Sequence, residues 1–163
     1  WVNDSKATHV AAARSALLSL DRPIVLLAGG TDKGEDFTGL VPEGADMRAV
    51  ISYGAAGPRI AFEGEGSDLV EGDFRGVLEA ARGAAQPGDV ILLSPACSSF
   101  DMFESYEDRG RRFSEFAREN VSPPAPWTSP RLVRCACPTP VWAVAGKVGR
   151  FWGSRFCFSH SAS

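Results

Sequence analysis

The chain has 163 residues, of which 44% are apolar and 23% charged, a composition typical of one compact globular domain. The formal net charge of −3 excludes an overall basic surface for nucleic acid, and no basic amphipathic segment suits a membrane surface. No apolar run approaches the ~18 residues of a membrane-spanning helix, and no signal-peptide pattern opens the chain. We therefore expect a cytoplasmic protein.

The first predicted elements are a helix and a buried strand. We expect the helix to run from Asn3 to Leu20, because Asn3 or Asp4 suits its N-terminal cap and apolar residues then recur every three or four positions. The segment Ile24–Gly30 is an uninterrupted apolar run that ends in glycines. Such a run is typical of a strand buried on both faces and thus of a parallel sheet.

The following elements alternate between strands and helices. Further strands are expected at Arg48–Tyr53, Asp68–Val70 and Val90–Leu93, each close to glycine or proline. The spacing of apolar residues predicts helices from Phe74 to about Gly83 and over residues 105–120. This alternation predicts an α/β fold with a mostly parallel sheet, in which ligands bind at the carboxyl ends of the strands.

Residues 121–163 differ in composition from the rest of the chain. They contain none of the 20 acidic and five of the 17 basic residues, so the formal charge is −8 for residues 1–120 and +5 beyond. This segment is rich in Pro, Trp and Cys and shows no helical or strand period, so we expect an irregular, poorly ordered tail. Its Cys135, Cys137, Cys157 and His160 are too irregularly spaced to predict a zinc site.

Three polar segments are candidates for a ligand site. Asp4–Thr8 would place Lys6 in the first turn of the predicted helix, where the dipole disfavours a cation; a plain helix start is the alternative. Gly29–Phe37 follows the buried strand and sets Lys33 among glycines, which suits anion binding or an ordinary turn, and it lacks the Walker spacing. Ser94–Gly110 follows the clearest strand, where hydroxyls and helix N–H groups suit a carboxylate.

The sequence predicts no covalent catalysis in this chain. Cys97 lacks a histidine placed to activate it, so we interpret it as a buried, unreactive thiol. We assign no role to His9 or His160, because a lone histidine is weak evidence for acid–base chemistry. We accordingly expect no catalytic residue and no metal ligand here.

Three strings carry a family resemblance: WVNDSKAT, LLAGGTDKGEDF and PGDVILLSPACSSFDMFESYEDRGRRF. In order and spacing they resemble the C-terminal domain of the D-glutamate-adding enzymes of the Mur ligase family, over about residues 1–120. The resemblance implies a three-layer Rossmann-like domain with helices on both faces of the sheet.

The function that this resemblance implies is ligation in peptidoglycan synthesis, and hence in cell wall biogenesis and cell division. ATP phosphorylates the alanine carboxylate of UDP-N-acetylmuramoyl-L-alanine, and the amine of D-glutamate attacks the acyl phosphate. ATP and Mg²⁺ would be bound mainly by an upstream domain of a monomeric enzyme. We therefore expect residues 1–120 to be its D-glutamate-binding domain and the chain to be inactive alone.

The resemblance also assigns individual residues. It places Asp4 and Lys6 beside ATP. It places D-glutamate at Thr8, Lys33, Ser99, the backbone of Phe100 and an aromatic position occupied by Tyr106. The chain departs from the family pattern at His9, where asparagine is common, and at Phe100, where leucine is common. These two departures affect the detailed shape that the resemblance implies for the amino-acid pocket.

Two other functions remain open from the sequence. One is a stand-alone α/β binding module for an anionic metabolite or nucleotide, which would bind its ligand without other domains. The other is a folate-polyglutamate-type ligase domain that attaches L-glutamate, which the SPACSSFD string disfavours. The start at Trp1 indicates an upstream truncation, and we interpret residues 121–163, without a family counterpart, as a reading-frame shift or an unrelated extension.

Overall fold

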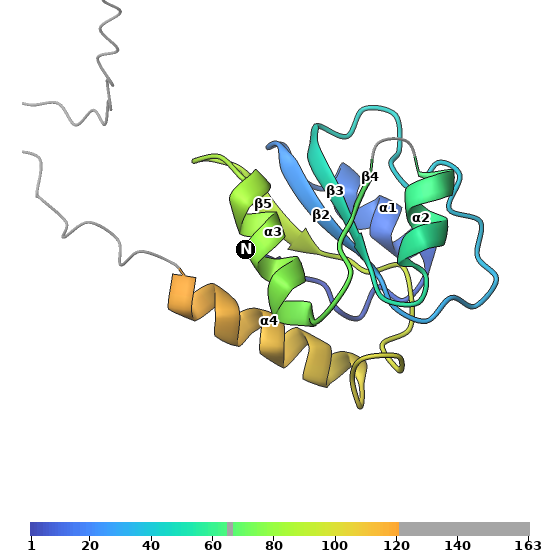
Figure 1. Cartoon of the computed structure of the whole chain (residues 1–163). Coiled ribbons are helices and arrows are strands. Elements are labelled where there is room, and N and C mark those ends of the chain that lie inside the picture. Colours follow the sequence, from blue (N-terminus) through green and yellow to red (C-terminus); the bar gives the residue numbers. More distant parts are fainter. Residues whose placement is uncertain (65–66, 121–163) are drawn as a thin grey trace, which may run out of the picture. The chain divides into compact units, whose positions relative to one another are not determined.

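The computed structural model describes residues 1–64 and 67–120, which form a parallel sheet between two layers of helices (Figure 1). The strands are β1 (Val2–Asn3), β2 (Ile24–Gly29), β3 (Met47–Tyr53), β4 (Ser67–Leu69) and β5 (Val90–Leu93). The helices are α1 (Val10–Leu18), α2 (Gly57–Glu63), α3 (Phe74–Ala84) and α4 (Tyr106–Asn120). The predicted three-layer α/β fold is confirmed. The predictions for residues 121–163 concern residues outside this part of the chain.

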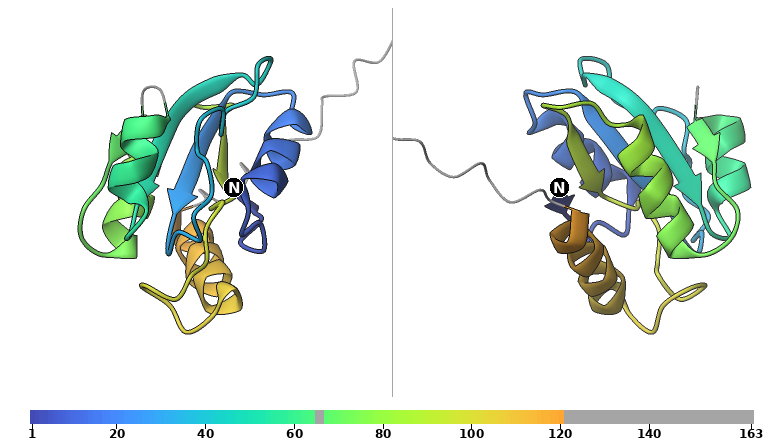
Figure 2. Two further views of the ribbon diagram at one scale, coloured as in Figure 1. Left: turned by 90° about the vertical axis from the view of Figure 1, so that its right-hand side faces the viewer. Right: turned by 60° about the vertical axis from the view of Figure 1, so that its left-hand side comes forward.

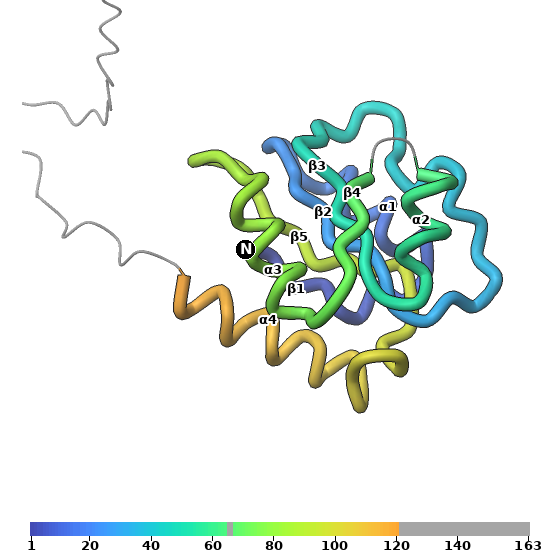
Figure 3. Tube along the Cα trace, viewed as in Figure 1, coloured from blue at the N-terminus to red at the C-terminus, as the bar shows by residue number. Residues whose placement is uncertain are grey.

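The strand order places the first strand of the chain beside the last. The order is β1-β5-β2-β3-β4, and every neighbouring pair is parallel. Val2 pairs with Leu92 and Asn3 with Leu93, so β1 lies beside β5 (Figure 3). From β2 the chain moves outward to β3 and β4 and then returns to β5 on the opposite side of β2. Parallel sheets bind ligands at the carboxyl ends of strands where the order reverses in this way.

Two apolar cores cover the two faces of the sheet, because successive residues of a strand point in opposite directions. Leu26 of β2 belongs to the core that contains Leu17 of α1 and Ile60 of α2. The next residue, Leu27, belongs to the core that contains Phe113 of α4. The helices consequently lie on both sides of the sheet (Figure 2). Burial on both faces explains why β2 is apolar throughout.

The first helix begins at Val10, and the prediction that it begins at Asn3 is wrong. Residues 2–3 form an edge strand instead, and neither Asn3 nor Asp4 caps the helix. The cap comes from a distant loop, because a carboxylate oxygen of Glu35 accepts a hydrogen bond from the Val10 N–H at 3.1 Å. Local capping rules could not show that residues 2–3 find a partner strand about ninety positions later.

The other predicted elements are observed with boundaries within about two residues of those expected. Helix α2 was not predicted, because the glycine-rich stretch before it obscures a start in which Pro58 occupies the first turn. Within the described part of the chain, no helix combines the length and apolar character needed to cross a membrane.

Candidate functional site

The predicted ligand-binding segments lie together at the carboxyl edge of the sheet. The Ala96 N–H donates to the Ala7 carbonyl at 2.9 Å, which joins the segments that follow β5 and β1. Thr31 and Ser98 exchange two backbone hydrogen bonds, at 2.8 and 3.1 Å, which join the segments that follow β2 and β5. The three joined segments carry Thr8, Lys33 and Ser99. Residues far apart in sequence thus converge where the strand order reverses.

Two glycines make this close approach of backbones feasible. Gly29 and Gly30 have φ angles of 154° and 130°. A Cβ atom added at Gly29 would lie 2.0 Å from the Tyr53 carbonyl oxygen, and one at Gly30 would lie 2.0 Å from that of Ser98. The space left by the missing side chains of these two glycines is therefore filled by the backbone of the protein itself, and not by a ligand. Gly34, with φ of 83°, has open space beside it.

Lys33 lies in a turn that ionic and hydrogen-bonding contacts fix. A carboxylate oxygen of Asp32 accepts from the backbone N–H groups of Gly34 at 2.8 Å and Glu35 at 3.1 Å. Arg59 of α2 forms an ion pair with Asp32 and donates to the Glu35 carbonyl at 2.7 Å. Lys33 is exposed, so its ammonium group is accessible to a ligand. Sequence reasoning missed Arg59, although its spacing from Glu63 is that of a helical ion pair.

His9 and Glu35 connect the start of α1 to the same turn. The His9 Nδ1 atom lies 2.8 Å from one Glu35 carboxylate oxygen, and the Val10 N–H donates to the other. The hydrogen bond with His9, and then that from Val10, lower the pKa of the Glu35 carboxyl below its ordinary value of 4.5. His9 therefore contacts the turn that carries Lys33, a contact that sequence reasoning missed.

The segment that follows β5 is buried as far as Ser99 and then becomes exposed. Ser99 is 2% exposed, and its carbonyl accepts from the Phe103 N–H at 2.9 Å. Phe100 is 75% exposed at the protein surface. Cys97 is 1% exposed, and burial raises the pKa of its thiol to about 12, so it stays protonated near neutral pH. This supports the interpretation of Cys97 as an unreactive thiol.

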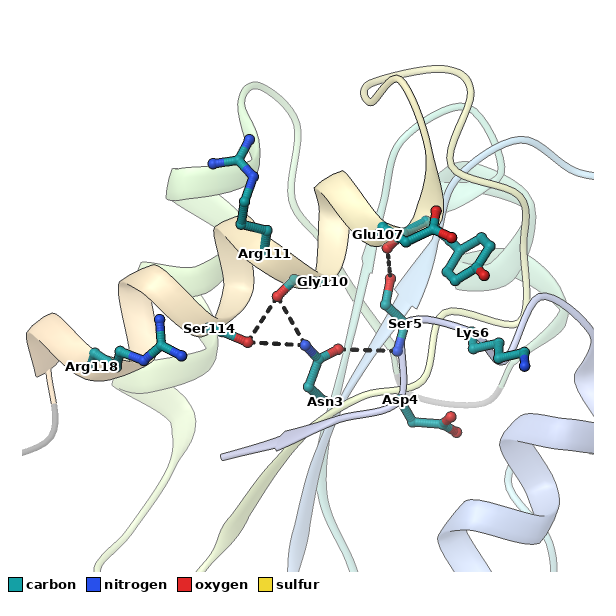
Figure 4. A pocket seen from close by; sticks show the side chains of 10 residues that line it. Asn3, Asp4, Ser5, Lys6, Glu107, Gly110, Arg111, Ser114 and Arg118 are labelled. Carbon is teal, nitrogen blue, oxygen red and sulfur yellow. Dashed lines mark hydrogen bonds between the residues drawn. The ribbon is translucent and has the colours of Figure 1, made fainter.

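A cleft of about 410 Å³ lies between the segment that follows β1 and helix α4 (Figure 4). Its lining includes Asp4, Lys6 and Tyr106. Asp4 accepts a hydrogen bond from the Ser94 hydroxyl at 3.0 Å, and the Ser5 hydroxyl donates to the Tyr106 carbonyl at 2.8 Å. The two residues that the resemblance places beside ATP therefore share one cleft. Tyr106, assigned to the D-glutamate pocket, lines this cleft as well.

The helical argument for Lys6 is wrong. Residues 4–9 precede α1, so Lys6 does not oppose a helix dipole, and Asp4 and Thr8 do not share a helix face. Lys6 is exposed in a turn at the cleft. Its position beside the carboxyl end of β1, and not a conflict with helix chemistry, makes it a candidate ligand residue.

Arg109 is a buried residue that sequence reasoning missed. Its side chain is 0% exposed and donates to Ser5, Cys97 and Gly29, which lie at or just after the carboxyl ends of three different strands. The sequence gives only a weak signal for it, because Arg109 is one of three arginines within four residues of an otherwise polar helix.

Comparisons with known proteins identify the family to which the chain is similar. Residues 1–97 match the family model described as Mur ligase, glutamate ligase domain. The chain is similar to proteins named UDP-N-acetylmuramoylalanine--D-glutamate ligase. Identity is 54% over 117 residues for that of Salinibacter ruber and 48% over 122 residues for that of Rubrobacter xylanophilus.

These alignments cover 69% and 72% of this chain but 25% and 28% of the relatives. The chain thus spans about a quarter of the length of the curated relatives that it matches. The family match itself covers more than half of the 163 residues, including the segments of Thr8 and Lys33. The resemblance found in the sequence is therefore confirmed, and the chain belongs to the Mur ligase, glutamate ligase domain family.

Proposed function

We propose that residues 1–120 are the D-glutamate-binding C-terminal domain of an ATP-dependent ligase. This cytoplasmic, monomeric enzyme joins D-glutamate to UDP-N-acetylmuramoyl-L-alanine in peptidoglycan synthesis. The observation that carries the proposal is the convergence of the Thr8, Lys33 and Ser99 segments through the Ala7–Ala96 and Thr31–Ser98 hydrogen bonds. The names of the relatives support this substrate. Because the chain spans a quarter of their length, we expect it to be inactive alone.

The amino-acid side of the site suits a ligand with two carboxylates. Lys33 supplies a positive charge, and the hydroxyls of Thr8 and Ser99 supply hydrogen-bond donors from two other segments. The attacking group is the amine of D-glutamate itself, so these side chains bind and orient it without forming a covalent bond. His9 shapes this side through Glu35, and the exposed Phe100 forms its rim, where its backbone would contact the amino acid.

The nucleotide side is the cleft of Asp4 and Lys6. Lys6 would place its ammonium group toward the phosphates of ATP, and Asp4 stays oriented by the Ser94 hydroxyl. Mg²⁺, when bound, would neutralise developing phosphate charge. Residues 1–64 and 67–120 contain no group of three or more acidic, histidine or cysteine side chains arranged to hold a metal ion.

A hybrid enzyme tests the proposal. The full 163-residue chain replaces the corresponding C-terminal segment of the Salinibacter ruber ligase, and ADP release is measured with and without D-glutamate. We expect release to depend on D-glutamate and on UDP-N-acetylmuramoyl-L-alanine. Lys33→Ala should raise the KM for D-glutamate at least about tenfold, as the loss of a charge-assisted hydrogen bond does, with the KM for ATP changed less than about twofold.

Arg22→Ala is the matched control. It removes an exposed cation that bonds to Gly88 at the opposite edge of the sheet, so both KM values should stay unchanged. An unchanged D-glutamate KM in Lys33→Ala would remove Lys33 from the site. A folded hybrid without D-glutamate-dependent ADP release would contradict the proposed function. Binding of an anionic metabolite by the 163-residue chain alone would then favour the stand-alone binding module.

A further inference from the structure

Arg109 presents a buried positive charge for which the described residues supply no carboxylate partner. Its side chain is 0% exposed, and no ion pair joins it to an acidic residue within residues 1–64 and 67–120. Removing an ionised group from water is costly unless its N–H groups find acceptors. The acceptors that bond to Arg109 therefore indicate which part of the structure its burial stabilises.

The Arg109 guanidinium donates to three segments of the chain. Its Nε and Nη2 atoms donate to the Ser5 hydroxyl at 3.0 Å and the Ser5 carbonyl at 2.9 Å. Both Nη atoms lie 3.2 Å from the Cys97 carbonyl oxygen, and Nη1 lies 3.5 Å from that of Gly29. Ser5 and Cys97 follow β1 and β5, and Gly29 is the last residue of β2. One planar fork thus connects all three segments that form the site.

Two of the three acceptor residues lie within two positions of a proposed ligand residue. Ser5 stands between Asp4 and Lys6, which we place at the nucleotide, and Cys97 stands two positions before Ser99, which we place at the amino acid. The Ser5 hydroxyl accepts from Arg109 and donates to the Tyr106 carbonyl, so it also ties the nucleotide segment to the start of α4.

We propose that Arg109 is a positioning residue that fixes the nucleotide-binding segment and the amino-acid-binding segments relative to one another. The inference rests on the proposed function and extends it to a residue that contacts neither ligand. It has a distinctive consequence. Loss of Lys33 affects D-glutamate alone, whereas loss of the Arg109 fork displaces Lys6 and Ser99 together and weakens the use of both ATP and D-glutamate.

The test compares Arg109→Lys, Ser5→Ala and Arg112→Lys in the hybrid enzyme. Arg109→Lys keeps the charge but cannot reach three acceptors at once, and we expect the KM values for ATP and D-glutamate each to rise at least about tenfold. Ser5→Ala removes one acceptor and should raise both by about threefold. Arg112 is exposed on the same helix and pairs with Asp108, so Arg112→Lys should change neither KM.

Thermal unfolding separates positioning from simple stabilisation. An Arg109→Lys hybrid with a lowered Tm, but with both KM values within twofold of wild type well below that Tm, would overturn the inference and leave the proposed function intact. If the Arg109→Lys hybrid fails to fold, the Ser5→Ala hybrid provides the test, because this substitution removes only a hydroxyl. Unchanged KM values for ATP and D-glutamate in Ser5→Ala then overturn the inference. A folded wild-type hybrid without D-glutamate-dependent activity contradicts the proposed function, and the inference with it.

Discussion

The two halves of the carboxyl edge are held together by different kinds of contact. In the half between β2 and β5, backbone atoms meet directly, through the Thr31–Ser98 hydrogen bonds and the close approach of Gly30 to Ser98. In the half between β1 and α4, side chains make the connections. Asn3, Ser5 and Arg109 form hydrogen bonds that join the carboxyl end of β1 and the residues after it to α4. The two halves carry the proposed amino-acid and nucleotide sides, respectively.

This difference determines which substitutions each half tolerates. Backbone hydrogen bonds persist when most side chains change, but they fail when a new Cβ atom separates the two chains. Side-chain connections fail one at a time, because each depends on a particular amide, hydroxyl or guanidinium. We therefore expect the first half to be sensitive at its glycines and the second to be sensitive at its polar residues.

The largest expected effect is that of Gly30→Ala in the β2–β5 half. The new Cβ atom would lie 2.0 Å from the Ser98 carbonyl oxygen, at a φ of 130° that non-glycine residues rarely adopt. We expect the free energy of unfolding of the 163-residue chain to fall by about 3 kcal/mol, through combined overpacking and backbone strain. Urea unfolding monitored by circular dichroism measures this loss.

Gly34→Ala is the matched control for that prediction. Gly34 also has a positive φ, 83°, but no atom lies within 4 Å of its added Cβ. Only backbone strain remains, so the loss should be about 1 kcal/mol. Equal losses for the two variants would show that the close approach to Ser98 does not govern stability at this edge.

A smaller effect is expected for Asn3→Ala in the β1–α4 half. The Asn3 amide nitrogen donates to the Gly110 carbonyl at 2.8 Å and to the Ser114 hydroxyl at 3.0 Å, and its oxygen accepts from the Ser5 N–H at 3.1 Å. Because Asn3 is partly solvated, we expect a loss of about 1 kcal/mol in the free energy of unfolding. In the hybrid enzyme, the KM for ATP should also rise, since the cleft of Lys6 loses its support.

The control for Asn3→Ala is a cap substitution far from the cleft. Asp73 caps α3 by accepting from the Gly76 N–H at 2.9 Å, so Asp73→Ala should also cost about 1 kcal/mol. Its KM for ATP should stay at the wild-type value. A rise in both variants would mean that the effect of Asn3 reflects general destabilisation and not the geometry of the cleft.

The smallest expected effect concerns pH and Glu35, which connects the turn after β2 to the start of α1. Its carboxyl pKa is lowered by the hydrogen bonds with His9 and Val10, so folding favours its ionised form. This contribution to stability is complete above the unfolded pKa of about 4.5 and is lost as pH falls through the lower folded pKa. Glu35→Gln should therefore lower stability by about 0.5 kcal/mol near neutral pH and by less at about pH 3.

Urea unfolding of wild type and Glu35→Gln at several pH values measures this difference directly. Other carboxyls also titrate in this range, but they contribute equally to both proteins, so only the difference is informative. A difference that stays constant from pH 7 to pH 3 would show that the contact of Glu35 with His9 and Val10 does not depend on its charge.

Much of the layered architecture follows from local sequence patterns. The apolar run Ile24–Gly29 indicated a strand buried on both faces, and the apolar spacing from Phe74 to Ala81 indicated one side of a helix. The order of the motifs likewise indicates the family, because three strings in sequence are more specific than any one of them.

What the sequence determined by itself was the α/β class, most element boundaries and the family, since these depend on periodicity and on short motifs. Tertiary structure decided the rest. It turned residues 2–3 into a strand beside β5, supplied the cap of α1 from Glu35, and buried Arg109 among three segments. These features rest on contacts between residues 12 to more than 100 positions apart, which no local pattern encodes, because the folding of the whole sheet brings the partners together.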